Sequence, residues 1–281
     1  MSEGQRMIKY IAIAFGTFLS VGIISFTVSC LLFGFGIFGS LLGLNVQEQS
    51  SISQEEVTFS ETYEMVDNLK LDCKLSQVIL VPGDKLQVET KNIKQKFSSR
   101  ISGNTLVIEE SQPFAFWDKR ENAQIKITIP RDFKFREVKI SAGAGEVEIE
   151  GLITETLKLE IGAGNTKIND ITVEKQADID GGVGKVNISN ASLKNLNLDV
   201  GVGDFKLSGK LTGDTDIDCG VGRLELVIQD RQENYTIKAK KGIGEFKIQN
   251  QSVDKDITMG NGAYRLEMDA GIGKTQVSFE E

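Results

Sequence analysis

A recurring Gly-x-Gly pair punctuates the C-terminal half of the chain. Eight such pairs begin at Gly143, Gly162, Gly182, Gly201, Gly220, Gly242, Gly260 and Gly271. The successive steps are 19, 20, 19, 19, 22, 18 and 11 residues, and each pair lies between short runs that alternate apolar and polar residues. A period near 20 with one glycine corner per repeat is typical of a stacked-coil array, in which each repeat contacts its neighbours.

The residues that follow each pair also recur in columns. The position two residues after the second glycine holds Val147, Thr166, Val186, Phe205, Leu224, Phe246, Tyr264 and Thr275. The position four residues after it holds Ile149, Ile168, Ile188, Leu207, Leu226, Ile248, Leu266 and Val277. This period of two predicts a strand with one buried face, and the run before each pair alternates in the same way. Each coil is therefore expected to contain a strand, a glycine corner, a second strand and a polar loop.

The first outward position after each corner supports stacking of the coils. Lys185, Asp204, Arg223 and Glu245 alternate in charge from one repeat to the next. Parallel coils in register would make these residues cross-strand neighbours about 5 Å apart, where unlike charges stabilise the sheet. We therefore expect Asp204 beside Arg223, and Arg223 beside Glu245. An antiparallel meander that turns on glycine is the alternative, but it does not explain this recurrence.

Glycine is expected at the corners because stacked bends bring backbones close together and can require positive φ. The predicted structural corners are Gly143, Gly145, Gly162, Gly164, Gly182, Gly184, Gly201, Gly203, Gly220, Gly222, Gly242 and Gly244. The predicted fold class is all-β, a parallel β-helix or solenoid with coils of about 19–20 residues.

The N-terminal region has the features of a membrane anchor. Residues 10–44 contain no charged residue, a run longer than the ~20 residues that cross a bilayer. Arg6 and Lys9 precede this run and acidic residues follow it, which favours a cytoplasmic N-terminus and an extracellular C-terminal domain. A cleaved signal peptide or a lipoprotein cut before Cys30 are weaker interpretations, because the apolar run is too long and continues past Cys30.

Five segments follow from these patterns. Residues 1–9 form the cytoplasmic N-terminus, 10–44 the single transmembrane helix, and 45–56 a polar linker. Residues 57–137 form irregular first coils and a cap, because one end of a stack must meet water. Residues 138–281 form the regular solenoid repeats. The predicted localisation is the cell membrane, as a single-pass protein.

Composition argues against several functions. The net charge of -8 disfavours a nucleic-acid partner, and the chain contains no histidine, the commonest general base and metal ligand. Cys30, Cys73 and Cys219 form no CxxC motif, so we expect no metal site. Cys73 and Cys219 could form a disulfide if the fold brought them together, but we expect two isolated, half-buried thiols. The run 271–275 resembles the end of a phosphate-binding loop, but Met268 stands where the motif needs glycine. We expect no cofactor and no enzymatic activity.

An acidic column lies two residues before the corners, at Glu160, Asp180, Asp199 and Asp218. A solvated outward face is the first interpretation. A weak cation site is a second, and carboxylate catalysis of the kind found in β-helical polysaccharide enzymes is a third.

Two features outside the repeat form a possible interaction patch. Phe114, Phe116 and Trp117 either cap the open end of the core or form an exposed surface for a glycan, a partner or a membrane. Lys91, Lys94, Lys96 and Arg100 form a basic stretch on an acidic chain. This stretch is either a solvated edge or a contact for anionic envelope polymer or lipid head groups.

One stretch carries a family resemblance. It runs from Ile127-Thr128-Ile129-Pro130 into Val138-Lys139-Ile140-Ser141-Ala142-Gly143-Ala144-Gly145-Glu146-Val147-Glu148-Ile149 and the later repeats. In this stretch the chain resembles the LiaG-like, putative-adhesin proteins of Gram-positive bacteria. The resemblance implies one membrane helix, an extracellular glycine-rich β-solenoid, an envelope location and a link to envelope-stress signalling. It supplies no catalytic residues.

The predicted function is therefore a membrane-anchored, extracytoplasmic binding or scaffold module of the bacterial cell envelope. Its expected partners are membrane lipid and envelope membrane proteins or cell-wall polymer, and oligomers are compatible with the fold. The alternatives are a surface adhesin for a glycan or host ligand, a self-assembling solenoid scaffold, and a β-helical polysaccharide enzyme. Specific glycan binding, concentration-dependent filaments and turnover of cell-wall polymer would respectively identify them.

Overall fold

The computed structural model describes residues 59–93, 97–110 and 123–281. The chain divides into two compact units, Met1–Ser53 and Gln54–Glu281, and the described residues all belong to the second. The predicted transmembrane segment 10–44 and linker 45–56 lie outside the described residues and stay predictions. None of the helices formed by the described residues is long and apolar enough to cross a membrane.

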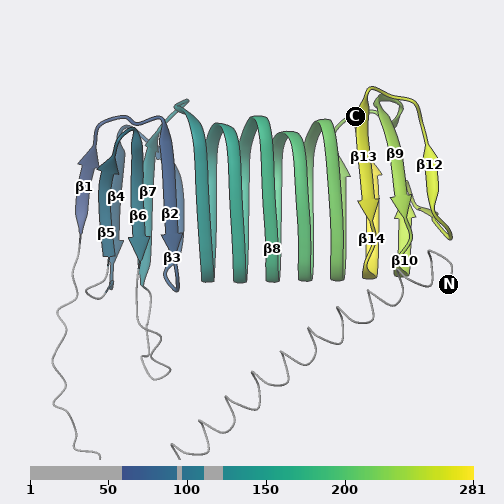
Figure 1. The fold of residues 1–281 in the computed structure, drawn as a ribbon, viewed down its shortest axis with the longest axis horizontal. Coiled ribbons are helices and arrows are strands. Elements are labelled where there is room, and N and C mark those ends of the chain that lie inside the picture. The colour runs from purple at the N-terminus through teal and green to yellow at the C-terminus, as the bar shows by residue number, and fades with distance from the viewer. Residues whose placement is uncertain (1–58, 94–96, 111–122) are drawn as a thin grey trace, which may run out of the picture. The chain divides into compact units, whose positions relative to one another are not determined.

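The described part of the chain is all-β apart from one short 3₁₀ helix, η1 (Gln232–Asn234). Its strands are β1 (Ser60–Tyr63), β2 (Asn68–Cys73), β3 (Gln77–Gly83), β4 (Leu86–Lys91), β5 (Phe97–Ser102), β6 (Thr105–Glu110), β7 (Gln124–Pro130), β8 (Lys134–Ile228), β9 (Tyr235–Lys240), β10 (Ile243–Ile248), β11 (Gln251–Ser252), β12 (Ile257–Met259), β13 (Tyr264–Asp269) and β14 (Ile272–Phe279). The long β8 winds through successive side-by-side coils (Figure 1).

The coils of β8 stack in chain order because each glycine corner lies on the one before it. A Cβ placed on Gly162 would lie 2.0 Å from the carbonyl oxygen of Gly143, and the same contact recurs at each later corner of β8. Side chains one repeat apart also meet: the Lys206 Nζ donates to Glu225 Oε1 at 2.7 Å. The strands that flank β8 pair with it in parallel. The fold is therefore β-solenoid-like, and the antiparallel meander is excluded for this region.

The coils do not follow chain order at the C-terminal end, which corrects one prediction. β14 pairs in parallel with β8 on one side and with β10 on the other. Lys274 therefore lies between Arg223 and Glu245, so the expected contact of Arg223 with Glu245 is wrong. The Lys274 Nζ lies 3.3 Å from Glu245 Oε2. β9 and β10 form the outer coil, and the later strands β13 and β14 form the coil between it and β8.

The Gly260 pair is also not a corner of this stack. Gly260 and Gly262 lie against the backbone of Tyr235 and Asn234, in the loop between β12 and β13. Tyr264 therefore begins the strand before the Gly271 corner, rather than the strand after a Gly260 corner. Its ring contacts that of Tyr235, with centroids 5.5 Å apart.

The N-terminal end shows a similar exchange of order. β2 and β3 pair with β8, whereas β6 and β7, which come later in the chain, pair with β2 and β3 from outside. Antiparallel strands then close both ends: β1 lies on β4, β5 on β6, β12 on β9, and β11 on β10. These short strands occupy the sheet edges that an open stack would expose.

The corner of the β2–β3 coil contains no glycine and is held by a buried carboxylate. Glu110 is 1% exposed, and its Oε2 accepts hydrogen bonds from the backbone N–H groups of Lys74, Leu75 and Ser76 at 3.0–3.1 Å. Burial opposes ionisation, but the hydrogen bonds from Cys73, Leu75 and Ser76 outweigh it and hold the pKa of Glu110 below its ordinary value. A side chain thus satisfies the donors of this turn.

We predict that Gly203→Ala destabilises the protein by at least ~3 kcal/mol. Gly203 has φ +138°, and an added Cβ would lie 1.9 Å from the carbonyl oxygen of Gly184, so strain and overlap act together. Gly103→Ala is the matched control, because Gly103 has φ +60° with nothing within 4 Å of an added Cβ. It should cost only ~1–2 kcal/mol. Guanidinium unfolding measures both, and equal losses would mean that contact between corners does not limit stability.

We predict that the exchanged coil order can be trapped by disulfides. In a background without the native cysteines, Arg223→Cys with Lys274→Cys should crosslink on mild oxidation, since neighbouring coils lie ~4.8 Å apart. Arg223→Cys with Glu245→Cys spans two coil steps, ~10 Å, and should not crosslink within one molecule. Peptide mapping of the oxidised monomer reads out both pairs. A crosslink between positions 223 and 245, with none between 223 and 274, would show instead that the coils stack in chain order.

Candidate functional site

A groove runs along the stack beside the glycine corners. It has a volume of about 550 Å³ and draws the same three positions from each of five consecutive coils. Its lining residues are Ser141, Ala142, Gly143, Glu160, Ile161, Gly162, Asp180, Gly181, Gly182, Asp199, Val200, Gly201, Asp218, Cys219 and Gly220. Because the same three positions recur in every coil, each row of residues along the groove comes from one position of the repeat.

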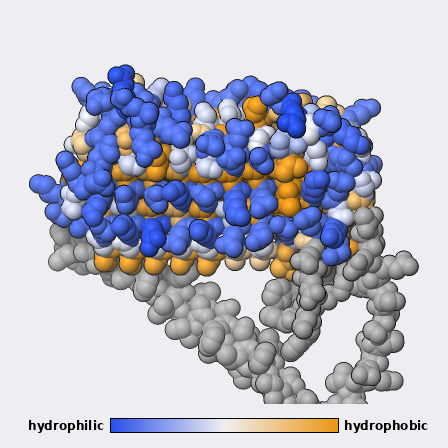
Figure 2. Space-filling model, turned by 180° about the vertical axis from the view of Figure 1, so that it is seen from behind, coloured by the Kyte–Doolittle hydropathy of each residue, from blue (hydrophilic) through white to orange (hydrophobic). Residues whose placement is uncertain are grey.

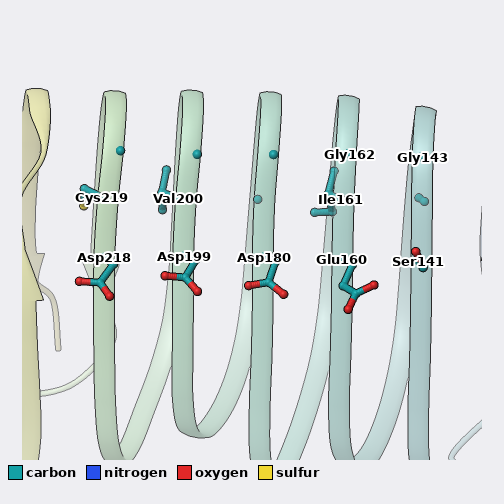
Figure 3. A pocket seen from close by; sticks show the side chains of 15 residues that line it. Ser141, Gly143, Glu160, Ile161, Gly162, Asp180, Asp199, Val200, Asp218 and Cys219 are labelled. Carbon is teal, nitrogen blue, oxygen red and sulfur yellow. The ribbon is translucent and has the colours of Figure 1, made fainter. Parts of the chain in front are cut away.

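The acidic column predicted from the sequence forms one wall of this groove. Glu160, Asp180, Asp199 and Asp218 lie in one row across neighbouring coils, with Ser141 continuing it (Figure 3). The parallel register of β13 extends the row, since Asp269 lies beside Asp218 on one side and beside Lys240 on the other. Sequence reasoning missed Asp269, although it lies two residues before Gly271 and so has the spacing of the other acidic residues in the row.

Like charges are adjacent in this row. The carboxylate of Glu160 is paired with Lys158 at 2.8 Å, and that hydrogen bond lowers the pKa of Glu160. Asp199 has no such partner among the described residues. Partial burial, followed by the neighbouring Asp180 and Asp218, raises the pKa of Asp199. The middle of the wall is therefore a site of concentrated negative charge.

The floor of the groove is more apolar. Ile161, Val200 and Cys219 lie in a second row, between the acidic row and the glycines (Figure 3). The Cys219 thiol is half-buried and free, and burial raises its pKa to about 11. Cys73 is also free and fully buried. Both thiols therefore agree with the expectation of unpaired cysteines.

An exposed row of aliphatic side chains borders the groove on the side of the glycines. We call the residues between the paired glycines the corner ladder: Val183, Val202, Val221, Ile272 and Ile243, in the order of the stacked coils. Each is 46–72% exposed. Apolar residues gather in a row along one edge of the molecule (Figure 2), and the ladder gives this face aliphatic character.

The predicted interaction patch falls largely outside the described residues. Phe114, Phe116, Trp117, Lys94 and Lys96 lie there, and their roles stay predictions.

Two patch residues are described. Lys91 is exposed at the end of β4. Arg100 lies on β5, where its guanidinium donates to Glu109 at 2.8 Å, so its charge is already paired within the molecule.

The groove combines charged and apolar surfaces. In the described ranges, no group of three or more acidic or cysteine side chains is arranged to hold a metal ion, and the chain contains no histidine. The groove offers a row of carboxylates, an apolar floor and an apolar rim. This combination can hold a partner that brings both cationic and aliphatic groups.

We predict that Asp199→Asn stabilises the protein at neutral pH. The pKa of Asp199 is raised above its ordinary 3.8 in the folded state, so the folded state binds more protons than the unfolded state between those pKa values. Stability therefore falls as pH rises through that window. Removing the charge should raise the Tm at pH 7 by about 1–2 °C, with less gain as the pH approaches 3.8.

The matched control for this prediction is Asp204→Asn. Asp204 lies in the outward column, between coils that carry Lys185 and Arg223 at the same position. Neutralising Asp204 should give no rise in Tm, because it removes favourable charge interactions with Lys185 and Arg223. A similar gain at both positions would point to the net charge of -8 rather than to the acidic row.

Comparison with solved structures finds distant similarity to several bacterial proteins. A "putative adhesin" from Bacteroides fragilis shares 12% identity with a TM-score of 0.46, covering 79% of this chain and 96% of that chain. A "putative cell adhesion protein" from Clostridium sporogenes shares 13% identity with a TM-score of 0.34, covering 80% and 100%. A "putative lipid binding protein" from Parabacteroides distasonis shares 13% identity with a TM-score of 0.36, covering 79% and 96%.

A comparison with curated proteins finds no match. The family model described as Toastrack DUF4097 matches residues 51–270, which is most of the chain and contains the groove, the acidic row and the corners before Gly271. The chain therefore belongs to the Toastrack DUF4097 family.

Proposed function

We propose that this chain is a binding and scaffold module without enzymatic activity, displayed on the outer face of a bacterial cell membrane. The contact surface is the face that carries the groove and the corner ladder. Residues 10–44 supply the anchor, on the evidence of their length and lack of charge. In this proposal the solenoid holds its contact face at a fixed geometry outside the cell, alongside the envelope-stress signalling that the family resemblance implies.

The single observation that carries the proposal is the repetition of the groove. Five consecutive coils contribute the same three positions to it. An enzyme site needs different groups placed at one point, whereas this surface offers the same groups again at each coil. Such a surface suits an extended contact with another macromolecule.

The electrostatics support the same conclusion. Asp199 carries a raised pKa because it is partly buried near Asp180 and Asp218. Like charges in adjacent cross-strand positions cost stability. A cationic group from a partner would relieve this repulsion, so the row is better suited to the bound state than to the free one.

The experiment uses the full-length chain in cells. A photo-crosslinking amino acid replaces Val202 on the corner ladder, or Ile101 on β5 as the control, since both are exposed apolar residues, at 50% and 43%. Ultraviolet light should give adducts of higher mass from position 202 and few from position 101. Protease added to intact protoplasts should also digest the chain after about residue 50. Protection of that region, or equal adducts from both positions, would contradict the proposal.

A further inference from the structure

The corner ladder is an apolar surface that the fold itself does not require. Val183, Val202, Val221, Ile272 and Ile243 are 57%, 50%, 46%, 50% and 72% exposed. Ala163 occupies the same position in an earlier coil, so a small side chain suffices for the corner. A contiguous exposed apolar row on a soluble surface marks an interaction site.

Opposite charges stand on the two sides of this ladder in the same coil. The position three residues before the ladder belongs to the acidic row, and the position two residues after it belongs to the outward column. The pairs are Asp180 with Lys185, Asp218 with Arg223, Asp269 with Lys274, and Lys240 with Glu245. Both signs are reversed in the last pair. Asp199 with Asp204 is the exception, so the cationic groups of a matching surface would come from the coils of Lys185 and Arg223 on either side of this one.

Part of this pattern is satisfied within the molecule. Lys240 pairs with Asp269 at 2.8 Å, and Glu245 pairs with Lys274 at 3.3 Å, across neighbouring coils. The central coils differ. Among the described residues, Asp180, Asp218 and Arg223 form no direct ion pair, although Lys158 lies near enough to Asp180, and Lys240 near enough to Asp218, for a charge interaction. Asp180 and Asp218 also flank Asp199 in one row.

Resting on the proposed function of this face, we propose that its partner is a second copy of the chain, in a parallel homodimer. In this dimer the two-fold axis runs along the direction in which the coils stack, so each coil faces the same coil of the second copy. The ladder of each copy then lies in the groove of the other, and Asp218 lies opposite Arg223 of the second copy. A symmetric interface uses one patch twice, so that patch must complement itself.

Self-complementarity favours a second copy over other occupants. An anionic bilayer would be repelled by the acidic row beside the ladder. An unrelated protein would place no requirement on the two flanking columns of this chain to match each other. In an antiparallel dimer about an axis perpendicular to the stack, acidic row would face acidic row.

The size of the face sets the strength of the dimer. Seven stacked corners at ~4.8 Å per coil give a contact about 30 Å long and one ridge wide. Such a contact belongs to the small class of interfaces, below about 1,200 Å² in total, whose complexes are weak. Tethering of two copies to one membrane raises their effective concentration and compensates for this weakness.

The test begins with self-association of the full-length chain in detergent, measured by sedimentation velocity over a concentration series. Val202→Ser with Val221→Ser should raise the dimer dissociation constant at least tenfold. Met65→Ser with Ile101→Ser is the matched control, since both residues are 43% exposed and lie off the ladder. The control should dimerise like the parent chain. A parent chain that stays monomeric, or two double variants that dimerise equally, would overturn the proposal.

A charge exchange tests the parallel geometry and does not depend on the serine variants folding well. Asp218→Arg alone and Arg223→Asp alone should each weaken the dimer, and the two together should restore it. Thermal unfolding of each variant separates dimer loss from unfolding. An antiparallel dimer would not be restored, which would overturn the parallel arrangement.

The crosslinking at Val202 separates this proposal from the function on which it rests. An adduct of twice the chain mass supports the homodimer. An adduct with a different protein would leave the binding function in place and overturn the second copy as its partner.

Discussion

The close contact between stacked corners is the constraint on which the rest of the structure depends. Each corner of β8 places a backbone carbonyl where the Cβ of a larger residue in the next coil would lie, as at Gly162 over Gly143 and Gly203 over Gly184, at 2.0 and 1.9 Å. Glycine alone fits both the contact and the positive φ of the second position. Once the corners are in contact, parallel register follows, and every other position of the repeat becomes a column along the stack. Core, acidic row and corner ladder are all consequences of that register.

The sequence predicted this register well where the repeat is regular and failed where a similar pattern arises for another reason. Val186, Phe205 and Leu224 are buried as the period of two indicated. The pair Gly260-Asn261-Gly262 looked like a further corner, but it serves a loop that packs on Tyr235. Charge alternation was also misleading: Glu245 seemed to complement Arg223, yet Lys274 lies between them. No local signal could reveal this, because the exchange of coil order protects the terminal strands of the stack and does not arise from the repeat itself.

That solution has a clear physical basis. A chain that simply stopped at its last coil would leave its final strand at an open edge, where strands fray and pair with other molecules. Here β14 has a parallel neighbour on each side, and short antiparallel strands cover the outer coil. The N-terminal end repeats the device with β2 and β3. Glu110 solves the related problem of a corner without glycine, since its carboxylate satisfies three backbone donors of the turn. A buried carboxylate in that role could not be read from the sequence around it.

The acidic row was visible in the sequence, but its meaning was not, because an outward column and a groove wall have the same spacing. The structure separates them through their neighbours. In the outward column, Lys185, Asp204 and Arg223 alternate in sign, which is the arrangement that cross-strand stability favours. In the groove, Asp180, Asp199 and Asp218 repeat one sign at the same coil spacing, and partial burial together with these like-charged neighbours raises the pKa of Asp199. These two columns of one repeat therefore have opposite charge patterns. Stability accounts for the alternating charges of the outward column. The acidic row is disfavoured in the free molecule, and a cationic group of a partner would offset its repulsion.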